Sequence, residues 1–98
     1  MKVYYVYILK CSDNTYYTGI TSRLSKRFEE HQAGKYPDSY TCKRRPITLA
    51  FYAEFTNPSI AIETEKQIKK WSKLKKEALI DGEFQKLPNL AKKNFKMR

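Results

Sequence analysis

Residues 4–34 decide the fold, and they read YYVYILKCSDNTYYTGITSRLSKRFEEHQAG. Aromatic and β-branched residues fill residues 2–11 and 15–20, a composition that favours two strands. The first segment is apolar on both of its faces, as is typical of a strand in the centre of a sheet. The turn-forming residues SDNT between the two segments predict a β-hairpin.

The length of the hairpin loop determines whether Tyr7 and Tyr17 lie on the same face of the sheet, because side chains alternate along a strand. A two-residue loop at 13–14 would place the two tyrosines on opposite faces. A three-residue loop at 13–15 would place them on one face.

We expect the three-residue loop, which would pair Leu9 with Gly19. One loop residue must then take the left-handed conformation, and Asn14 or Thr15 is placed to do so. Asparagine tolerates that conformation better than a β-branched residue does.

Residues 21–34 predict a helix that continues from the hairpin. Thr21 or Ser22 can cap its N-terminus, and Gly34 can end it. At the helical repeat of about 100° per residue, its apolar positions form one buried stripe, made of Leu24 and Phe28.

Two polar side chains, Arg27 and His31, lie within about 60° of Leu24 on the same side of this helix. Polar groups directed along a core-facing edge need hydrogen-bond partners, which the tyrosine face of the hairpin can supply. The alternative is an arginine at the rim of the core and a surface histidine whose hydrogen bonds are satisfied.

Residues 35–46 (KYPDSYTCKRRP) have no helical or strand period and predict a loop. A mobile, solvated loop is one interpretation. The other is contact with phosphates and bases, which suits basic residues interleaved with tyrosines. The residues concerned are Tyr36, Tyr40, Lys43, Arg44 and Arg45.

Residues 47–55 (ITLAFYAEF) predict a third strand, bounded by proline and asparagine. Asn57 as N-cap and Pro58 at the first helical position then open a second helix. Its inner side is expected to carry Ile60, Ala61, Thr64, Ile68 and Trp71.

Glu65 borders the apolar face of this second helix, whereas Glu63 points about 160° away from it, toward solvent. A carboxylate at the edge of a core loses hydration, which is unfavourable unless the carboxylate meets a cation or a metal. Two partners are therefore open for Glu65: a metal ion, or a nearby lysine in a salt bridge.

A third helix is expected over residues 72–82, capped by Ser72 and burying Leu74 and Ala78. Its exposed side would carry Lys73, Lys75 and Lys76. We expect one domain over residues 1–82, followed by a basic C-terminal extension, residues 83–98, that is a short helix or partly disordered.

The chain is strongly basic, with 20 Lys and Arg against 10 Asp and Glu among 98 residues and a net charge of +10. Residues 65–98 carry 11 of the basic and 4 of the acidic residues. This balance favours a nucleic-acid partner over a solvated basic surface or an anionic membrane. The candidate contacts are Lys43, Arg44, Arg45, Lys69, Lys73 and Lys76.

No run of about 18 apolar residues occurs, so no transmembrane helix is expected. The two cysteines, Cys11 and Cys42, are too few for a zinc site. Because the N-terminal segment has the pattern of a strand and not of an export signal, we expect free thiols and a cytoplasmic protein.

The expected inward polar set is Tyr7, Tyr17, Arg27, His31 and Glu65. One carboxylate can hold one hydrated Mg²⁺ or Mn²⁺, because these ions keep several waters and take phosphate oxygens as further ligands. An arginine can stabilise charge on a phosphoryl oxygen, and a tyrosine or histidine can take a proton from the attacking water. Ionising a tyrosine at pH 7 costs about 4 kcal/mol, which His31 and Arg27 would have to offset. The set predicts single-metal phosphodiester hydrolysis.

These residues resemble the motifs of the GIY-YIG nucleases, most closely the small stand-alone bacterial members. Tyr5-Val6-Tyr7 stands where the family has Gly-Ile-Tyr, and Tyr17-Thr18-Gly19 stands where it has Tyr-Ile-Gly. Arg27 and His31 follow at the family's spacing on the first helix. Glu65 stands at the position of the family's metal-binding glutamate.

The resemblance covers about residues 3–80 and implies an α/β (α+β) fold, with a three-stranded antiparallel sheet flanked by helices. It implies hydrolysis of DNA phosphodiester bonds with one divalent cation, Mg²⁺ or Mn²⁺. Our leading hypothesis is a nuclease of this kind that acts on DNA, with single-stranded or branched DNA as candidate substrates. Gly19 would allow the backbone to approach closely, and one active site would cut one strand, as a monomer or a weak homodimer.

Carried over position by position, Tyr7 would be the general base or would position the water, assisted by His31. Tyr17 would contact the scissile phosphate or the water. Arg27 would stabilise the developing charge, and Glu65 would bind the metal.

The chain departs from the excision-repair members of the family at Ile20, where those proteins carry a lysine, so no catalytic role is assigned there. The rival to an enzyme is a non-catalytic module that binds DNA or RNA through the basic loop and the C-terminal helices. Only the enzyme would yield cut products with a divalent ion.

Overall fold

This computed structural model describes residues 2–82 of the chain. The elements in chain order are β1 (Tyr4–Lys10), β2 (Tyr16–Thr21), α1 (Leu24–Ala33), the 3₁₀ turn η1 (Cys42–Arg44), β3 (Thr48–Phe55), α2 (Pro58–Lys69) and α3 (Lys73–Ile80). Within residues 2–82, no helix has the length and apolarity needed to cross a membrane. The expected basic extension, residues 83–98, lies outside the described residues.

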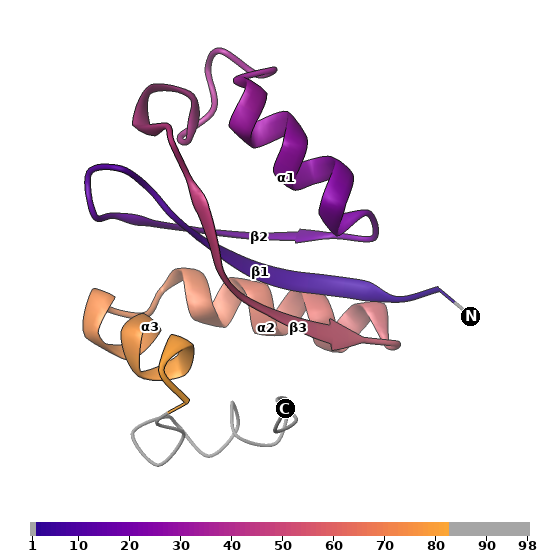
Figure 1. The fold of residues 1–98 in the computed structure, drawn as a ribbon. Helices are drawn as coiled ribbons and strands as arrows, with labels where there is room; N and C mark the ends of the chain where they lie inside the picture. Colours follow the sequence, from indigo (N-terminus) through magenta and orange to yellow (C-terminus); the bar gives the residue numbers. More distant parts are fainter. Residues whose placement is uncertain (1, 83–98) are drawn as a thin grey trace.

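The three strands form one antiparallel sheet in the order β2-β1-β3. The strand that is apolar on both faces therefore lies in the centre, as predicted. Helix α1 covers one face of the sheet, and α2 and α3 cover the other (Figure 1). The predicted α+β fold, a three-stranded antiparallel sheet flanked by helices, is confirmed.

The central strand contributes to two separate cores, one on each face of the sheet. Val6 and Ile8 pack against α2 and α3, together with Ala61, Ile68, Ala78 and Leu79. Tyr7 and Leu9 point the other way and pack with Cys11, Ile47 and the α1 residues Leu24 and Phe28. The predicted apolar stripe of α1 is thus in place.

The hairpin pairs Tyr7 with Gly19 and Leu9 with Tyr17. Tyr7 and Tyr17 share a face, as predicted, and their ring centroids lie 6.4 Å apart. The predicted pairing of Leu9 with Gly19 is wrong by two residues along the strand. A shift of two residues does not change which side chains share a face, so the prediction that Tyr7 and Tyr17 lie on one face still holds.

The loop explains this shift, because it consists of Ser12, Asp13 and Asn14, one residue earlier than expected. The Cys11 N–H donates to the Thr15 carbonyl oxygen at 2.8 Å and closes the loop. Asn14 takes a φ of 69°, the left-handed conformation expected of asparagine. The Asp13 carboxylate accepts hydrogen bonds from the Thr15 N–H (3.2 Å) and hydroxyl (2.6 Å).

Helix α1 begins after Arg23, so the predicted N-caps Thr21 and Ser22 are wrong. The Thr21 hydroxyl oxygen instead accepts the Arg23 N–H at 3.0 Å, in a turn that precedes the helix. Gly34 ends the helix with a φ of 69°, as predicted. Asn57 caps α2 through its side chain, also as predicted.

Helices α2 and α3 each expose one residue that was expected inside. Ile60 is more than one third exposed, and Leu74 is 77% exposed. Ser72 caps α3 and Ala78 is buried, both as predicted. Helix α3 packs through Ala78 and Leu79, and Leu74 lies about 140° from Leu79 around the helix, which takes it out of the core.

Candidate active site

The centre of the candidate site is Tyr7, whose side chain is 2% exposed. Its ring lies over Gly19 on the outer strand β2, where an added Cβ would come within 2.5 Å of Tyr7 Cζ. Side-chain carbons do not approach ring atoms that closely, so Gly19 is the residue that lets the ring pass. The Tyr7 phenol thereby lies over the outer strand β2, buried beneath α1.

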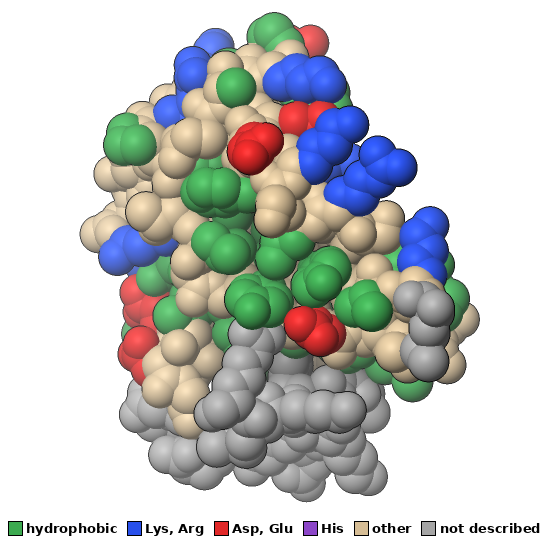
Figure 2. Space-filling model, turned by 45° about the vertical axis from the view of Figure 1, so that its right-hand side comes forward, with side chains coloured by type: hydrophobic (Ala, Val, Ile, Leu, Met, Phe, Trp, Pro, Cys, Tyr) green, Lys and Arg blue, Asp and Glu red, His purple; other side chains and the backbone are tan. Residues whose placement is uncertain are grey.

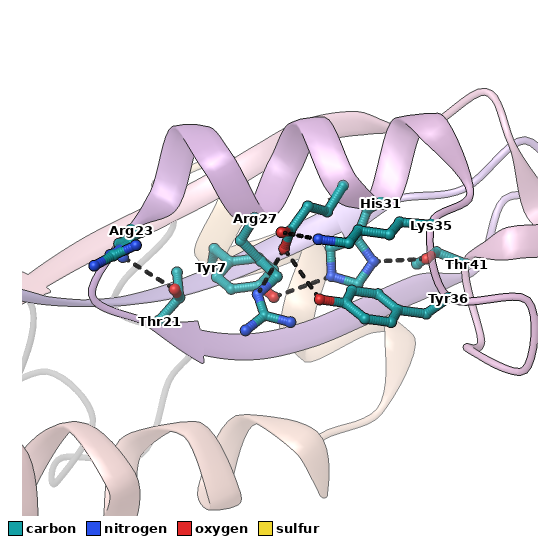
Figure 3. Close-up of polar contacts among 9 residues, drawn as sticks. Tyr7, Thr21, Arg23, Arg27, His31, Lys35, Tyr36 and Thr41 are labelled. Carbon is teal, nitrogen blue, oxygen red and sulfur yellow. Dashed lines mark hydrogen bonds and ion pairs between the residues drawn. The ribbon is translucent and has the colours of Figure 1, made fainter.

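Hydrogen bonds join three residues in a chain, from the Tyr7 phenol to His31 and from His31 to Thr41 (Figure 3). Tyr7 Oη lies 3.3 Å from His31 Nε2, and His31 Nδ1 lies 2.7 Å from Thr41 Oγ1. His31 is buried, and so is Thr41, which comes from the loop between α1 and β3. The histidine is therefore not a surface residue, and the tyrosine face supplies its partner, as expected.

Burial sets the proton state of this pair. It raises the pKa of Tyr7 well above the ordinary value of 10, with Tyr17 adding to the shift and Arg27 opposing it. Burial also lowers the pKa of His31, and the Arg27 charge lowers that pKa further. Both groups are neutral at pH 7, and the tautomer of His31 decides which of them donates the hydrogen bond.

Arg27 lies at the rim, with a side chain that is 41% exposed. Its Nε is 3.8 Å from a carboxylate oxygen of Glu30, and its guanidinium carbon is 5.9 Å from the Tyr36 ring centroid. Glu30 also accepts a hydrogen bond from Lys35 at 3.1 Å (Figure 3). The Arg27 guanidinium is therefore partly open to solvent, and its contact with the mostly buried Glu30 carboxylate is long.

Arg27 also lines a pocket of about 210 Å³ at the start of α1. The pocket has polar walls with three basic side chains and one acidic one, and it is formed by Thr21, Ser22, Arg23, Lys26, Arg27, Glu30 and Tyr36. Such a wall suits an anionic group such as a phosphate.

Tyr17 is the second aromatic residue of the site and is half-buried. Its ring centroid lies 5.2 Å from that of His31. On its other side it stacks with Tyr40 from the loop, at 6.1 Å and an interplanar angle of 24°. The two strands and the loop thus place Tyr7, Tyr17 and Tyr40 in one aromatic row.

Glu65 reaches the site from α2, on the opposite face of the sheet. Its side chain is 10% exposed, and its charge is one of the influences that raise the pKa of Tyr7. The expected alternative, a salt bridge, is present, because Lys69 Nζ lies 2.8 Å from Glu65 Oε2. The partner Lys69 is half-exposed, so this pair can open toward solvent.

The donor set around Glu65 fits one hydrated divalent ion. Among residues 2–82, no cluster of three or more His, Cys, Asp or Glu side chains is placed to hold a metal. A metal at Glu65 would therefore complete its shell with waters and phosphate oxygens, as Mg²⁺ does in phosphoryl-transfer sites. This matches the single carboxylate noted in the sequence.

The basic loop is tied to the hairpin turn and to α1 through two of its arginines. Arg44 donates to Asp13 at 3.0 Å and to the Tyr40 carbonyl oxygen at 2.8 Å, with its guanidinium carbon 3.9 Å from the Tyr40 ring centroid. Arg45 donates to the Gln32 carbonyl oxygen at 3.3 Å, near the end of α1. These contacts give both arginines a structural role.

The other predicted nucleic-acid contacts differ in exposure. Lys43 and Lys73 are exposed, whereas Lys69 is engaged by Glu65. Lys76 is half-buried instead of exposed as predicted, and this burial lowers its pKa, with the Lys69 charge adding to the shift. Of the four lysines predicted to contact nucleic acid, Lys43 and Lys73 are therefore exposed and are not engaged by Glu65.

The sequence did not single out Thr41, although it is fully buried against His31. It lies in a polar loop segment, where threonine is usual at the surface. A signal was available in principle, since a buried histidine needs a partner for each ring nitrogen. Only the fold shows that this loop supplies one.

One face of the molecule combines apolar and basic side chains. Hydrophobic side chains gather across its middle, and lysine and arginine side chains lie along its upper flank (Figure 2). This is the pairing expected of a surface that contacts both bases and phosphates.

The chain is similar to known proteins over most of its length. The GIY-YIG catalytic domain family matches residues 3–78. A UPF0213 protein of Syntrophus aciditrophicus is 47% identical over 76 residues, which cover 78% of this chain and 87% of that protein. A UPF0213 protein of Staphylococcus haemolyticus is 41% identical over 81 residues, covering 83% and 98%.

Two solved structures share the fold. The solution NMR structure of the UPF0213 protein BH0048 from Bacillus halodurans is 33% identical, with a TM-score of 0.54 and 93% of each chain covered. The solution NMR structure of the protein EF2693 from E. faecalis is 28% identical, with a TM-score of 0.61 and coverage of 91% and 94%. On the family match and these relatives together, the chain belongs to the GIY-YIG catalytic domain family.

Proposed function

We propose that this protein is a divalent-metal-dependent endonuclease that hydrolyses DNA phosphodiester bonds, with single-stranded or branched DNA as its substrate. The observation that carries the proposal is the Tyr7 phenol, which lies over Gly19 and is hydrogen-bonded to a buried, neutral histidine.

Tyr7 and His31 would activate the water in one concerted step. As the water oxygen bonds to phosphorus, its proton would pass to Tyr7 Oη, and the phenol proton would pass to His31 Nε2. The bond from phosphorus to the departing sugar oxygen would break in the same displacement, and that oxygen would take a proton from a solvent water to leave as a hydroxyl group. This route requires the tautomer in which His31 Nδ1–H donates to Thr41 Oγ1. It avoids a free tyrosinate, which the raised pKa of Tyr7 disfavours.

The remaining residues would act on the phosphate. Arg27 would leave its long contact with Glu30 and donate to a non-bridging oxygen, where charge develops in the transition state. Tyr17, half-exposed beside Tyr7, would contact the scissile phosphate or the water. Glu65 would hold a Mg²⁺ or Mn²⁺ ion, which supplies Lewis-acid stabilisation of the phosphate when bound.

A non-catalytic nucleic-acid-binding module is the second candidate. Two observations favour it. Lys69 occupies the Glu65 carboxylate that would hold the metal, and the raised pKa of Tyr7 opposes its ionisation. Both candidates predict binding that weakens as salt rises. They differ in whether a bond is broken.

The deciding experiment incubates the protein with labelled single-stranded, duplex and branched DNA and with RNA, in Mg²⁺, Mn²⁺ or EDTA. We expect metal-dependent cutting of DNA, and we expect Glu65→Ala to lower it by about 100-fold or more while binding in EDTA is retained. Glu63→Ala is the matched control, because Glu63 is exposed on the same helix. Binding without cutting by any ion would refute the enzyme and favour the module.

Two finer features belong to the same proposal. One site per chain suits a monomer or a weak homodimer that nicks one strand at a time. The free thiols of Cys11 and Cys42 are compatible with a reducing cytoplasm, where chromosomal DNA is within reach in a prokaryotic cell.

A further inference from the structure

A second concave surface adjoins the candidate active site. It is an open groove of about 620 Å³ between the start of α1 and strands β1 and β3. We call it the aromatic groove, and its main walls are Tyr5, Arg23, Leu24, Lys26, Leu49 and Tyr52. Its volume falls within the range of about 300–1,000 Å³ that is usual for ligand sites.

The floor of the aromatic groove continues the sheet face that carries Tyr7. Tyr5 lies two residues before Tyr7 on β1, and Tyr52 is paired with Tyr7 on β3, so all three side chains share that face. The Tyr5 and Tyr52 ring centroids are 6.1 Å apart. Leu49, on the same wall, is more than one third exposed, so the groove offers apolar and aromatic surface to solvent.

The aromatic groove adjoins the pocket that Arg27 lines. Ser22, Arg23 and Lys26 belong to the walls of both. A strand whose phosphate lies at Arg27 can therefore run along the start of α1 into the groove without leaving a basic surface. The exposed Glu54 on the β3 wall repels phosphate from that side.

We propose that the aromatic groove binds one unpaired nucleobase of the strand whose phosphate lies at Arg27. The base would lie on Tyr5 and Tyr52, and Arg23 and Lys26 would contact the adjoining phosphates. The assignment of the scissile phosphate to Arg27 rests on the proposed function. The groove itself selects single-stranded over fully paired nucleic acid, because a base within a duplex cannot reach the tyrosine rings without leaving its stack.

The first test measures binding in EDTA, so that cleavage plays no part. The probes are a labelled single-stranded oligodeoxynucleotide and a blunt DNA duplex of the same length. Tyr5→Leu and Tyr52→Leu keep apolar bulk in the groove and remove the ring face. Each should weaken single-strand binding by about 5- to 100-fold, the usual effect of losing one base–aromatic stack, and should leave duplex binding within about twofold.

Leu74→Ala is the matched control, because Leu74 is strongly exposed on α3, away from the groove. We expect it to change neither affinity. Thermal melts show whether each tyrosine variant folds, and a variant that unfolds is replaced by Leu49→Ser, which alters the same wall. Equal losses for single strand and duplex, or no loss for either, would overturn the proposal.

A second test locates the base directly. An oligonucleotide that carries one 5-iodouracil is irradiated with the wild-type protein, and the crosslinked residue is identified by mass spectrometry. We expect Tyr5 or Tyr52, and a crosslink only outside the groove contradicts the proposal. An RNA version of the same probe shows whether the groove distinguishes the two sugars, and sedimentation shows whether a second copy of the chain occupies it instead, which would also contradict the proposal.

These results separate the groove from the proposed enzyme. If the protein binds single strands through the two tyrosines but cuts DNA with no metal, the proposal for the groove is supported and the proposed nuclease activity is refuted. If both tyrosine variants cut DNA with a metal and keep the wild-type preference for single-stranded over duplex DNA, the nuclease activity is supported and the proposal for the groove is refuted.

Discussion

At the scale of single residues, the Tyr7–Gly19 contact is the tightest constraint in the candidate site. We predict that Gly19→Ala destabilises the fold by about 1–3 kcal/mol, because the added methyl group overlaps the Tyr7 ring and forces it aside. Chemical denaturation measures the loss, and metal-dependent cleavage should fall with it. In a Gly19→Ala background, Tyr7→Leu removes the ring and should recover part of the lost stability. If no stability is recovered, the loss does not come from overlap with the Tyr7 ring.

His31 is the only histidine of the chain, so its titration can be followed without overlap. We predict a midpoint below the ordinary value of 6.5, because burial and then the Arg27 charge disfavour the imidazolium. NMR of the ring protons against pH measures it, and Arg27→Gln should raise the midpoint. A midpoint at or above 6.5 in the wild type would contradict the buried site.

The same shift links stability to pH. The unfolded chain takes up a proton on His31 near pH 6.5, whereas the folded chain does so only at lower pH. This contribution to the free energy of unfolding is complete above pH 6.5 and is lost as the pH falls below that value, through the folded pKa.

At the scale of elements, the hairpin loop fixes which side chains meet over the sheet. Asn14 carries the positive φ that the three-residue loop requires. We predict that Asn14→Val destabilises the protein by about 1–2 kcal/mol, because a β-branched residue resists that conformation. Asn14→Gly, the matched control, should be close to neutral in the same denaturation experiment, and equal effects of the two changes would contradict this account.

The strands and helices also show which features of the fold can be predicted from sequence patterns. The apolar character of β1 on both faces predicted its central place, and turn chemistry predicted that Tyr7 and Tyr17 share a face. The residue pairs between β1 and β2 were predicted wrongly, because a three-residue loop can begin at Ser12 or at Asp13. The hydrogen bonds between Asp13 and Thr15 favour the loop that begins at Ser12. The helical repeat misplaced Leu74, since the direction in which α3 packs depends on the sheet beneath it.

The candidate site was predictable where its residues lie on regular elements. The spacing of Arg27 and His31 on α1 and the edge position of Glu65 on α2 follow from the helical repeat. The loop contribution could not be predicted in this way. Thr41 and Arg44 act through contacts with residues 10 and 31 positions earlier in the chain, and no periodicity encodes such pairings.

At the scale of the whole molecule, the charge of +10 predicts salt-sensitive binding to nucleic acid. We predict that Lys43→Ala lowers the slope of log affinity against log salt by about one and leaves the melting temperature unchanged, because Lys43 is exposed. Arg44→Ala, its neighbour, should lower the melting temperature, because it breaks the contacts with Asp13 and Tyr40. Equal effects of the two changes on melting would refute the structural role of Arg44.

The placement of α1 and α2 on opposite faces of the sheet has a consequence for the growing chain. Tyr7, Tyr17, Arg27 and His31 are all synthesised before Glu65, which also has to dock from the far side (Figure 1). A chain interrupted before α2 holds four of the five proposed catalytic residues and lacks the carboxylate for the metal. On the proposed mechanism, an unfinished or partly digested molecule of this kind would lack the residue that holds the metal and would not cut DNA.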